Sequence, residues 1–96
     1  MLEIRSHCEH CGKTLPNTAT NAMICNFECT YCADCAITVF ENVCPNCGGN
    51  FEKRPVRPSA YIEKYPPSTE KIIKPKDVEN LREHIARYKN IPPEKR

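Results

Sequence analysis

The alternation of apolar and polar residues predicts two helices, a short one in the middle of the chain and a longer one near its C-terminal end. In the stretch 33–42, Asp34 falls in the first turn, and Ala36, Ile37 and Phe40 share one face at helical spacing. We therefore expect a short helix between the sixth and seventh cysteines of the chain.

The second helix is predicted over residues 77–90, where Asp77 is suited to cap the N-terminus. Its apolar residues recur at i, i+3, i+7 and i+10 and form one stripe: Val78, Leu81, Ile85 and Tyr88. Two prolines follow and leave residues 91–96 as a flexible end. A helix of about thirteen residues is marginal alone, so we expect the stripe to dock on the head, on a second copy or on another protein.

Composition divides the chain near Phe51. All eight cysteines lie before this residue, whereas seven of the nine prolines follow Arg54. Residues 1–51 carry two basic and five acidic side chains, and residues 52–96 carry twelve basic and seven acidic ones. We expect a cysteine-rich head over 1–51 and an extended, basic, proline-rich arm over 52–76, because closely spaced prolines exclude a long helix or a central strand.

The chain is too short and too polar for several classes of protein. Its 96 residues are 40% hydrophobic, and no apolar run approaches the roughly 18 residues of a membrane span. The first five residues lack the apolar segment of a secretory signal peptide, so a cytoplasmic location is expected. A head of about fifty residues needs cross-links, either disulfides or metal ions, to stay folded. Metal ions are favoured over disulfides in a reducing compartment.

The eight cysteines have the spacing of metal ligands, C-x2-C-x13-C-x3-C-x2-C-x2-C-x8-C-x2-C. The first and last C-x2-C pairs form turns that we call the first knuckle (residues 8–12) and the second knuckle (residues 44–48). They end at Gly12 and Gly48, which permit a positive φ and let backbone N–H groups point at the sulfurs. Eight thiolates fill two tetrahedral zinc sites with none left over. The predicted cofactors are therefore two zinc ions.

The short helix indicates which cysteines share an ion. Eight helical residues span about 12 Å, whereas sulfurs on one zinc lie about 4 Å apart, so Cys44 is too far from Cys35 to join its site. Interleaved ligand sets follow: Cys8, Cys11, Cys32 and Cys35 in the first site, and Cys25, Cys29, Cys44 and Cys47 in the second. Sequential pairing stays open if residues 36–43 form a hairpin instead.

This ligand order, with a helix between the sixth and seventh cysteines, resembles the cross-braced RING finger and its binuclear treble-clef relatives. The resemblance covers residues 8–48 and implies a small metal-stabilised α+β fold of short hairpins and one helix. It does not carry over the docking of a ubiquitin-conjugating enzyme, because three positions depart from the RING ligases. These are His10 in the first knuckle, Val39 in place of a tryptophan, and Gly48 after the last cysteine.

The whole head also resembles a group of short bacterial proteins, the domain-of-unknown-function family 1272. The segments that carry the resemblance are Met1-Leu2-Glu3, Ala22-Met23-Ile24-Cys25 and Cys44-Pro45-Asn46-Cys47-Gly48-Gly49. The resemblance implies a soluble bacterial zinc protein and no particular activity.

Residues 25–32 are similar to the C-x3-C-x-aromatic-C motif of radical S-adenosylmethionine enzymes. Those enzymes need most of a barrel of roughly 200 residues, and the motif leaves five further cysteines unexplained. His7, His10 and His84 are expected at the surface, and the chain has no nucleophile–base constellation and no phosphate-binding glycine loop. We therefore expect a protein that is not an enzyme, with an iron–sulfur or thiol-redox protein as an alternative.

The basic arm raises nucleic-acid binding as a second alternative. Tyr61 and Tyr65 could stack on bases, and the basic side chains are Lys53, Arg54, Arg57, Lys64, Lys71, Lys74 and Lys76. These are spread rather than clustered, and two four-thiolate zinc sites would shift the formal net charge from +2 to about −2. The favoured prediction is a non-catalytic zinc-binding module, a protein-interaction or regulatory adaptor that binds a protein or a second copy through the apolar stripe and binds no membrane.

Overall fold

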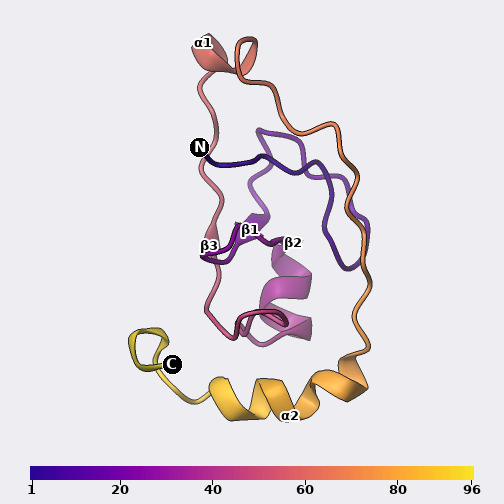
Figure 1. Cartoon of the computed structure of the whole chain (residues 1–96), viewed down its shortest axis with the longest axis vertical. Coiled ribbons are helices and arrows are strands. Elements are labelled where there is room, and N and C mark those ends of the chain that lie inside the picture. Colours follow the sequence, from indigo (N-terminus) through magenta and orange to yellow (C-terminus); the bar gives the residue numbers. More distant parts are fainter.

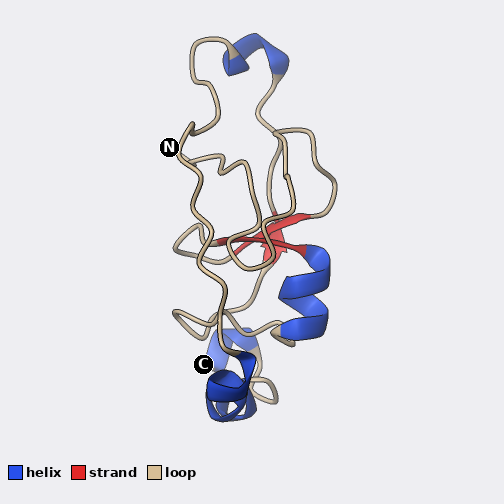
Figure 2. Ribbon diagram, turned by 90° about the vertical axis from the view of Figure 1, so that its right-hand side faces the viewer, coloured by secondary structure: helices blue, strands red, loops and turns tan.

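A three-stranded antiparallel sheet lies at the centre of the molecule in the computed structural model, which describes residues 1–96 (Figure 1). β1 (Ala22–Ile24) is the middle strand, with β2 (Thr30–Cys32) on one side and β3 (Glu52–Lys53) on the other. Both pairings are antiparallel. Figure 2 shows these short strands in red, with long loops above and below them. The protein is thus a small α+β fold in which most of the backbone is loop.

Aromatic side chains form the centre of the core. The ring of Tyr31 meets Phe40 at a centroid distance of 5.0 Å and Phe51 at 5.5 Å, both edge to face. Such pairs add about 0.5–1.5 kcal/mol each beyond the area they bury. Leu15 and Ala36 are fully buried in the same cluster, which also contains five of the cysteines. The cysteines and the hydrophobic core therefore form one unit.

The short helix is η1 (Asp34–Val39), a π-helical turn that follows β2. The N–H of Phe40 donates to the carbonyl of Cys35, five residues back, at 2.9 Å. The two residues after Phe40 take positive φ values of 51° and 61°, which ends the helix. The helix predicted over 33–42 is therefore present but shorter.

The apolar face predicted for this helix is wrong at one of its three residues. Ala36 and Phe40 are buried as expected, but Ile37 is 48% exposed. The wider π turn changes the angle between successive side chains, so the face predicted from α-helical spacing does not hold.

The fold of the head extends past the boundary predicted at Phe51. β3 pairs with β1, and Arg54, which follows it, is only 1% exposed. Its guanidinium donates to three backbone carbonyls, those of Arg5 (2.8 Å), Leu15 (3.1 Å) and Pro16 (2.7 Å). The predicted boundary therefore falls inside the sheet, because composition alone does not reveal an arginine that is buried.

The remainder of the arm is extended, apart from the one-turn helix α1 (Ser59–Ile62) at the end of the molecule opposite the C-terminal helix. The chain then returns along the N-terminal segment (Figure 1). On this path the N–H of Ser68 donates to the carbonyl of Ile4 at 2.9 Å, and that of Lys74 to the carbonyl of Glu9 at 2.6 Å. The arm therefore lies against the head.

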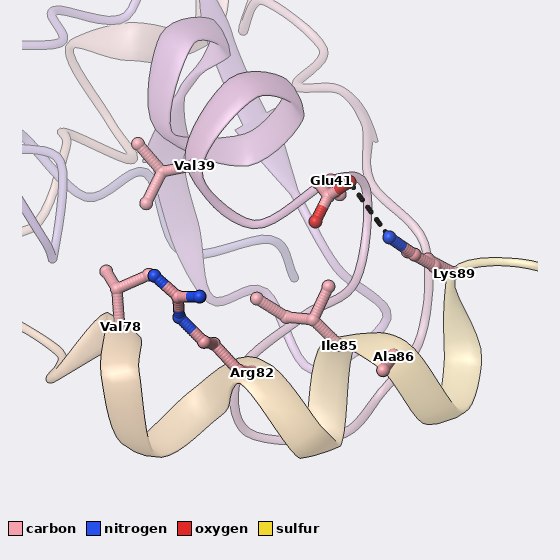
Figure 3. Close-up of a pocket in the computed structure, with 7 residues that line it drawn as sticks. All are labelled: Val39, Glu41, Val78, Arg82, Ile85, Ala86 and Lys89. Atoms are coloured by element: carbon pink, nitrogen blue, oxygen red, sulfur yellow. Dashed lines mark ion pairs between the residues drawn. The ribbon is translucent and has the colours of Figure 1, made fainter.

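The C-terminal helix α2 (Val78–Tyr88) has the predicted cap, since Asp77 accepts a hydrogen bond from the N–H of Glu79 at 3.1 Å. Its apolar stripe faces the head. Ile85 is 4% exposed and points from α2 toward the head in Figure 3, and Leu81 packs against the core. Of the docking sites left open by the sequence, the helix occupies the one on the head.

The last residues, predicted as a flexible end over 91–96, contact the head in the structure. They form a 3-10 turn, η2 (Pro93–Lys95), and the guanidinium of Arg96 donates to the carbonyls of Asn42 (2.9 Å) and Gly48 (3.1 Å). None of the helices combines the length and the hydropathy that a membrane span requires.

Candidate metal centre

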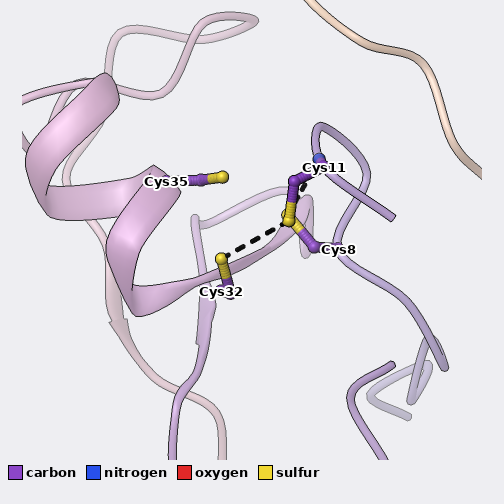
Figure 4. A group of neighbouring side chains, drawn as sticks. All are labelled: Cys8, Cys11, Cys32 and Cys35. Carbon is purple, nitrogen blue, oxygen red and sulfur yellow. Dashed lines mark hydrogen bonds between the residues drawn. The ribbon is translucent and has the colours of Figure 1, made fainter. Parts of the chain in front are cut away.

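The first cluster joins two segments that are distant in sequence. Its sulfur atoms all lie within 4.8 Å of one another and belong to Cys8, Cys11, Cys32 and Cys35 (Figure 4). Cys32 ends β2 and Cys35 lies in the first turn of η1, so the junction between strand and helix presents both sulfurs to the first knuckle. The sulfurs of Cys11 and Cys32 are 3.8 Å apart, which is close to the edge of a tetrahedron with ligand bonds of about 2.3 Å.

The second cluster contains Cys25, Cys44 and Cys47, whose sulfurs also lie within 4.8 Å of one another. Cys29 lies at the edge of this group. Hydrogen bonds from the thiols of Cys29 and Cys44 lower the pKa of Cys25 to about 3. The side-chain amide of Asn46 donates to the sulfur of Cys29 at 3.4 Å. The second cluster is less compact than the first, because only three of its four expected sulfurs lie within 4.8 Å of one another and that of Cys29 lies outside this group.

The two C-x2-C knuckles have the same local geometry. Gly12 and Gly48 take φ values of 80° and 79°, a conformation that favours glycine. The N–H of Gly12 donates to the carbonyl of Cys8 at 3.0 Å, and that of Gly48 to the carbonyl of Cys44 at 2.9 Å. A backbone N–H also points at a sulfur in each knuckle, at 3.5 and 3.4 Å. These are the contacts that stabilise a thiolate.

Short structural elements separate the two clusters. Strand β2 spans about 10 Å; Cys29, directly before the strand, lies at the edge of the second cluster, and Cys32 at the end of the strand belongs to the first. Likewise η1 separates Cys35 from Cys44. The grouping is the interleaved one, and the hairpin that sequential pairing needs is absent. The motif over residues 25–32 does not bring its three cysteines together, since Cys32 belongs to the first cluster.

The donor set fits a soft metal ion. All eight cysteines are free thiols, and both groups are made of sulfur atoms alone. Burial raises the pKa of Cys35, and hydrogen bonds to Cys25 and Cys29 raise that of Cys44. Several thiolates cannot share one small volume unless a cation compensates their charge. Both clusters could therefore hold a metal ion, and sulfur donors suit zinc, copper(I) and iron.

Two buried charged residues of the head are not predicted from the sequence. Glu9, inside the first knuckle, is 7% exposed and accepts hydrogen bonds from the guanidinium of Arg5 (2.8 Å) and the N–H of Thr30. Burial opposes the charge on Arg5, but the hydrogen bond and charge of Glu9 raise its pKa overall. The second residue is Arg54, whose pKa burial lowers. No spacing marks Arg54, because its partners are backbone carbonyls.

The histidines lie outside both clusters but contact the knuckles. The Nδ1 of His10 accepts a hydrogen bond from the N–H of Lys76 at 2.9 Å, and its ring meets Phe40 edge to face at 5.1 Å. The Nε2 of His84 lies 2.9 Å from the carbonyl of Cys44, to which it can donate. These side chains were expected at the surface, but each is half-buried and connects the tail to a knuckle.

A small α+β head with two cysteine clusters is thus the class that fold and site define. The chain belongs to the family described as "Protein of unknown function (DUF1272)", whose model matches residues 1–57. This confirms the resemblance seen in the sequence, and the matched region includes β3 and Arg54. The chain is 52% identical over 75 residues to "Uncharacterized protein R02474" of Rhizobium meliloti (strain 1021), an alignment that covers 78% of this chain and 89% of that protein. No solved structure matches the chain.

Proposed function

We propose that this protein is a non-catalytic zinc module in which two four-thiolate sites hold a RING-like, cross-braced head together. The observation that carries the proposal is the convergence of seven of the eight free thiols into two interleaved groups, with the eighth, Cys29, hydrogen-bonded to Cys25 at the edge of the second group. Zinc is the metal of choice for tetrahedral sulfur sites, and four protein ligands leave no open position for a substrate. The metal would therefore have a structural role.

The energetics support a structural role as well. A sheet whose strands have two or three residues each cannot hold a domain of this size. Structural zinc sites contribute about 10–16 kcal/mol each in apparent binding free energy, far more than a small core supplies. Folding of the head would thus depend on the metal.

Metal analysis of the purified chain tests this proposal. Native mass spectrometry of protein made without added metal is expected to give two zinc ions per chain and a colourless solution. Chelation under reducing conditions is expected to abolish the far-UV circular dichroism of the folded head, and zinc, but not magnesium, to restore it. A coloured preparation with near-stoichiometric iron would contradict the zinc proposal and favour the iron–sulfur alternative.

We further propose that the module serves as a protein-interaction adaptor. The loop around α1 projects from one end of the molecule (Figure 1) and carries exposed apolar and aromatic side chains: Val56 at 47%, Tyr61 at 58% and Tyr65 at 37% exposure. Aromatic residues are enriched in protein interfaces. The apolar stripe of α2 is less available, because Ile85 is covered by the head. Affinity capture with the wild-type chain and with Tyr61→Ser tests this role, since loss of a specific partner in the variant is expected.

The nucleic-acid alternative receives less support. Arg54 is buried, and the guanidinium of Arg57 donates to the carbonyls of Leu2 and Tyr65. Charge reversal at Arg54 would therefore damage the fold and cannot test phosphate binding. The suitable variant combines charge reversal at three exposed lysines, Lys53, Lys64 and Lys71. We expect no binding to DNA or RNA at physiological salt; tight binding that this variant abolishes would support the alternative.

A further inference from the structure

The second knuckle, residues 44–48, is contacted by the C-terminal part of the chain at several successive positions. His84 of α2 reaches the carbonyl of Cys44 at 2.9 Å, and the guanidinium of Arg96 donates to the carbonyl of Gly48 at 3.1 Å. Between these positions, the ammonium of Lys76 donates to the side-chain carbonyl of Asn46 at 2.9 Å. The same Asn46 donates to a sulfur of the second cluster.

The ring of Tyr88 lies directly on the turn of this knuckle. A Cβ atom added to Gly48 would lie 2.9 Å from Cε2 of Tyr88, so the ring occupies the space that a side chain would need. The rings of His84 and Tyr88 also meet edge to face at 5.3 Å. Two side chains of α2 and one from the end of the chain therefore surround the turn.

The first knuckle is contacted by a different segment. The arm residues Lys74 and Lys76 donate their backbone N–H groups to Glu9 and His10. A methyl group of Ile73 would lie 3.4 Å from a Cβ atom on Gly12, an ordinary contact distance. Lys76 thus contacts both knuckles, whereas α2 contacts the second one through His84 and Tyr88.

Beside the packed part of α2 there is an open groove. A groove of about 370 Å³ separates the helix from η1 and is lined by Val39, Val78 and Ile85 (Figure 3). Glu41 and Lys89 bridge it with an ion pair at 3.5 Å. Leu81 and Ile85 attach the helix to the head by apolar packing, and the contacts to the second knuckle add to this attachment.

We propose that His84, Tyr88 and Arg96 form a C-terminal clamp that positions the second knuckle for metal, so that metal binding there and docking of α2 are linked. The inference rests on the proposed function, in that both clusters must hold metal. The clamp fixes the carbonyls of Cys44 and Gly48 and with them the turn that leads into Gly49, whose N–H points at the sulfur of Cys47 at 3.4 Å. Supports of this kind typically change metal affinity 10- to 100-fold. By linkage, loss of the second metal weakens the docking of α2 by the same factor.

Zinc transfer from the full-length protein to a colorimetric chelator tests the clamp. In the variant that combines His84→Gln with Arg96→Gln, we expect one of the two zinc ions to transfer at least tenfold faster and the other to keep its wild-type rate. The matched control is Arg87→Gln, on the exposed face of the same helix, which should leave both rates unchanged. Equal rates in the clamp variant and the wild type, or equal acceleration of both ions, would overturn the clamp.

Hydrogen–deuterium exchange of the full-length protein tests the reverse direction. Removal of one zinc by Cys47→Ser is expected to raise exchange in α2 at least tenfold, while the backbone amides of the first knuckle stay protected in the same sample. Unchanged protection of α2 would contradict the linkage. If the purified chain holds no metal at all, the proposed function itself fails. If it holds two ions but the clamp variants behave as wild type, only the clamp fails.

Discussion

The two cysteine clusters have the same ligand type and the same knuckle turn, but their surroundings differ. In the first cluster Cys8, Cys32 and Cys35 are buried, and Cys11 alone is exposed. In the second, Cys29 and Cys47 are both half-exposed. A recess of about 400 Å³, which Phe27, Tyr88 and Arg96 also line, adjoins Cys47. Spacing in the sequence therefore determines which sulfurs meet, whereas the tail determines how well each cluster is covered.

This difference arises because different parts of the chain supply the ligands of the two clusters. The ligands of the first cluster lie on β2, η1 and a knuckle that the buried Glu9 ties to Thr30. The second cluster uses the β1–β2 turn and a loop, and its knuckle is completed by residues near the C-terminus. We therefore expect the two sites to differ in stability although their donor atoms are the same.

The largest effect is expected from removing one ligand of each cluster. Cys35→Ser and Cys47→Ser should each bind one zinc per chain, as native mass spectrometry will show. A structural zinc site contributes about 10–16 kcal/mol in apparent binding free energy. Each variant loses a large part of this contribution and should therefore be less stable than the wild type. Cys35 lies in the core, and its variant should lose the circular dichroism of the head, whereas Cys47→Ser should keep most of it. Equal loss in both variants would contradict the difference between the clusters.

The grouping of the cysteines could be predicted from the sequence because it depends on the lengths of the segments between them. The observed grouping is the predicted one, although the helix between Cys35 and Cys44 is a π turn that ends at Val39 and is shorter than the eight helical residues expected. The cap at Asp77 and the stripe of α2 were predictable for the same reason, since both follow local rules of spacing.

The supports of the clusters could not be predicted. Arg54 and Arg96 donate to backbone carbonyls, most of them in distant parts of the chain, and no pattern of side chains marks a carbonyl as a partner. From the sequence alone, Arg54 is therefore indistinguishable from the other basic residues of the arm. The exposure of Ile37 was missed because apolar spacing does not distinguish an α turn from a π turn.

The next largest effect is expected at Arg54, which supports the N-terminal side of the molecule. Arg54→Met removes a guanidinium that three carbonyls share and takes away the donor to the carbonyls of Arg5 and Leu15, whereas the carbonyl of Pro16 keeps the N–H of Ala19 at 2.9 Å. At about 1–3 kcal/mol for each unsatisfied group, we expect a loss of about 3–5 kcal/mol in the free energy of unfolding of the zinc-loaded protein in urea. The control is Lys53→Met, an exposed neighbour, which should change stability by less than about 0.5 kcal/mol.

The two knuckle glycines allow a matched comparison. Both Gly12→Ala and Gly48→Ala introduce a side chain at positive φ, which costs about 1–2 kcal/mol. Only the Cβ at Gly48 also collides with Tyr88, so we expect a further loss of about 1 kcal/mol there. In the Tyr88→Ala background this extra loss should disappear, which a double-mutant cycle measures. An extra loss that persists would mean that the ring does not rest on the turn.

The smallest effect is expected from the ion pair between Glu41 and Lys89, which spans the groove between η1 and α2. Both side chains are 40–50% exposed, so water and salt screen their attraction, and such pairs are worth about 0–1 kcal/mol. Glu41→Gln should therefore lower the free energy of unfolding only slightly, by an amount that falls as salt rises. Because neither side chain belongs to the clamp of His84, Tyr88 and Arg96, the variant should not change the rate of zinc transfer. A faster transfer would mean that the groove side of the helix, and not only the clamp, supports the second cluster.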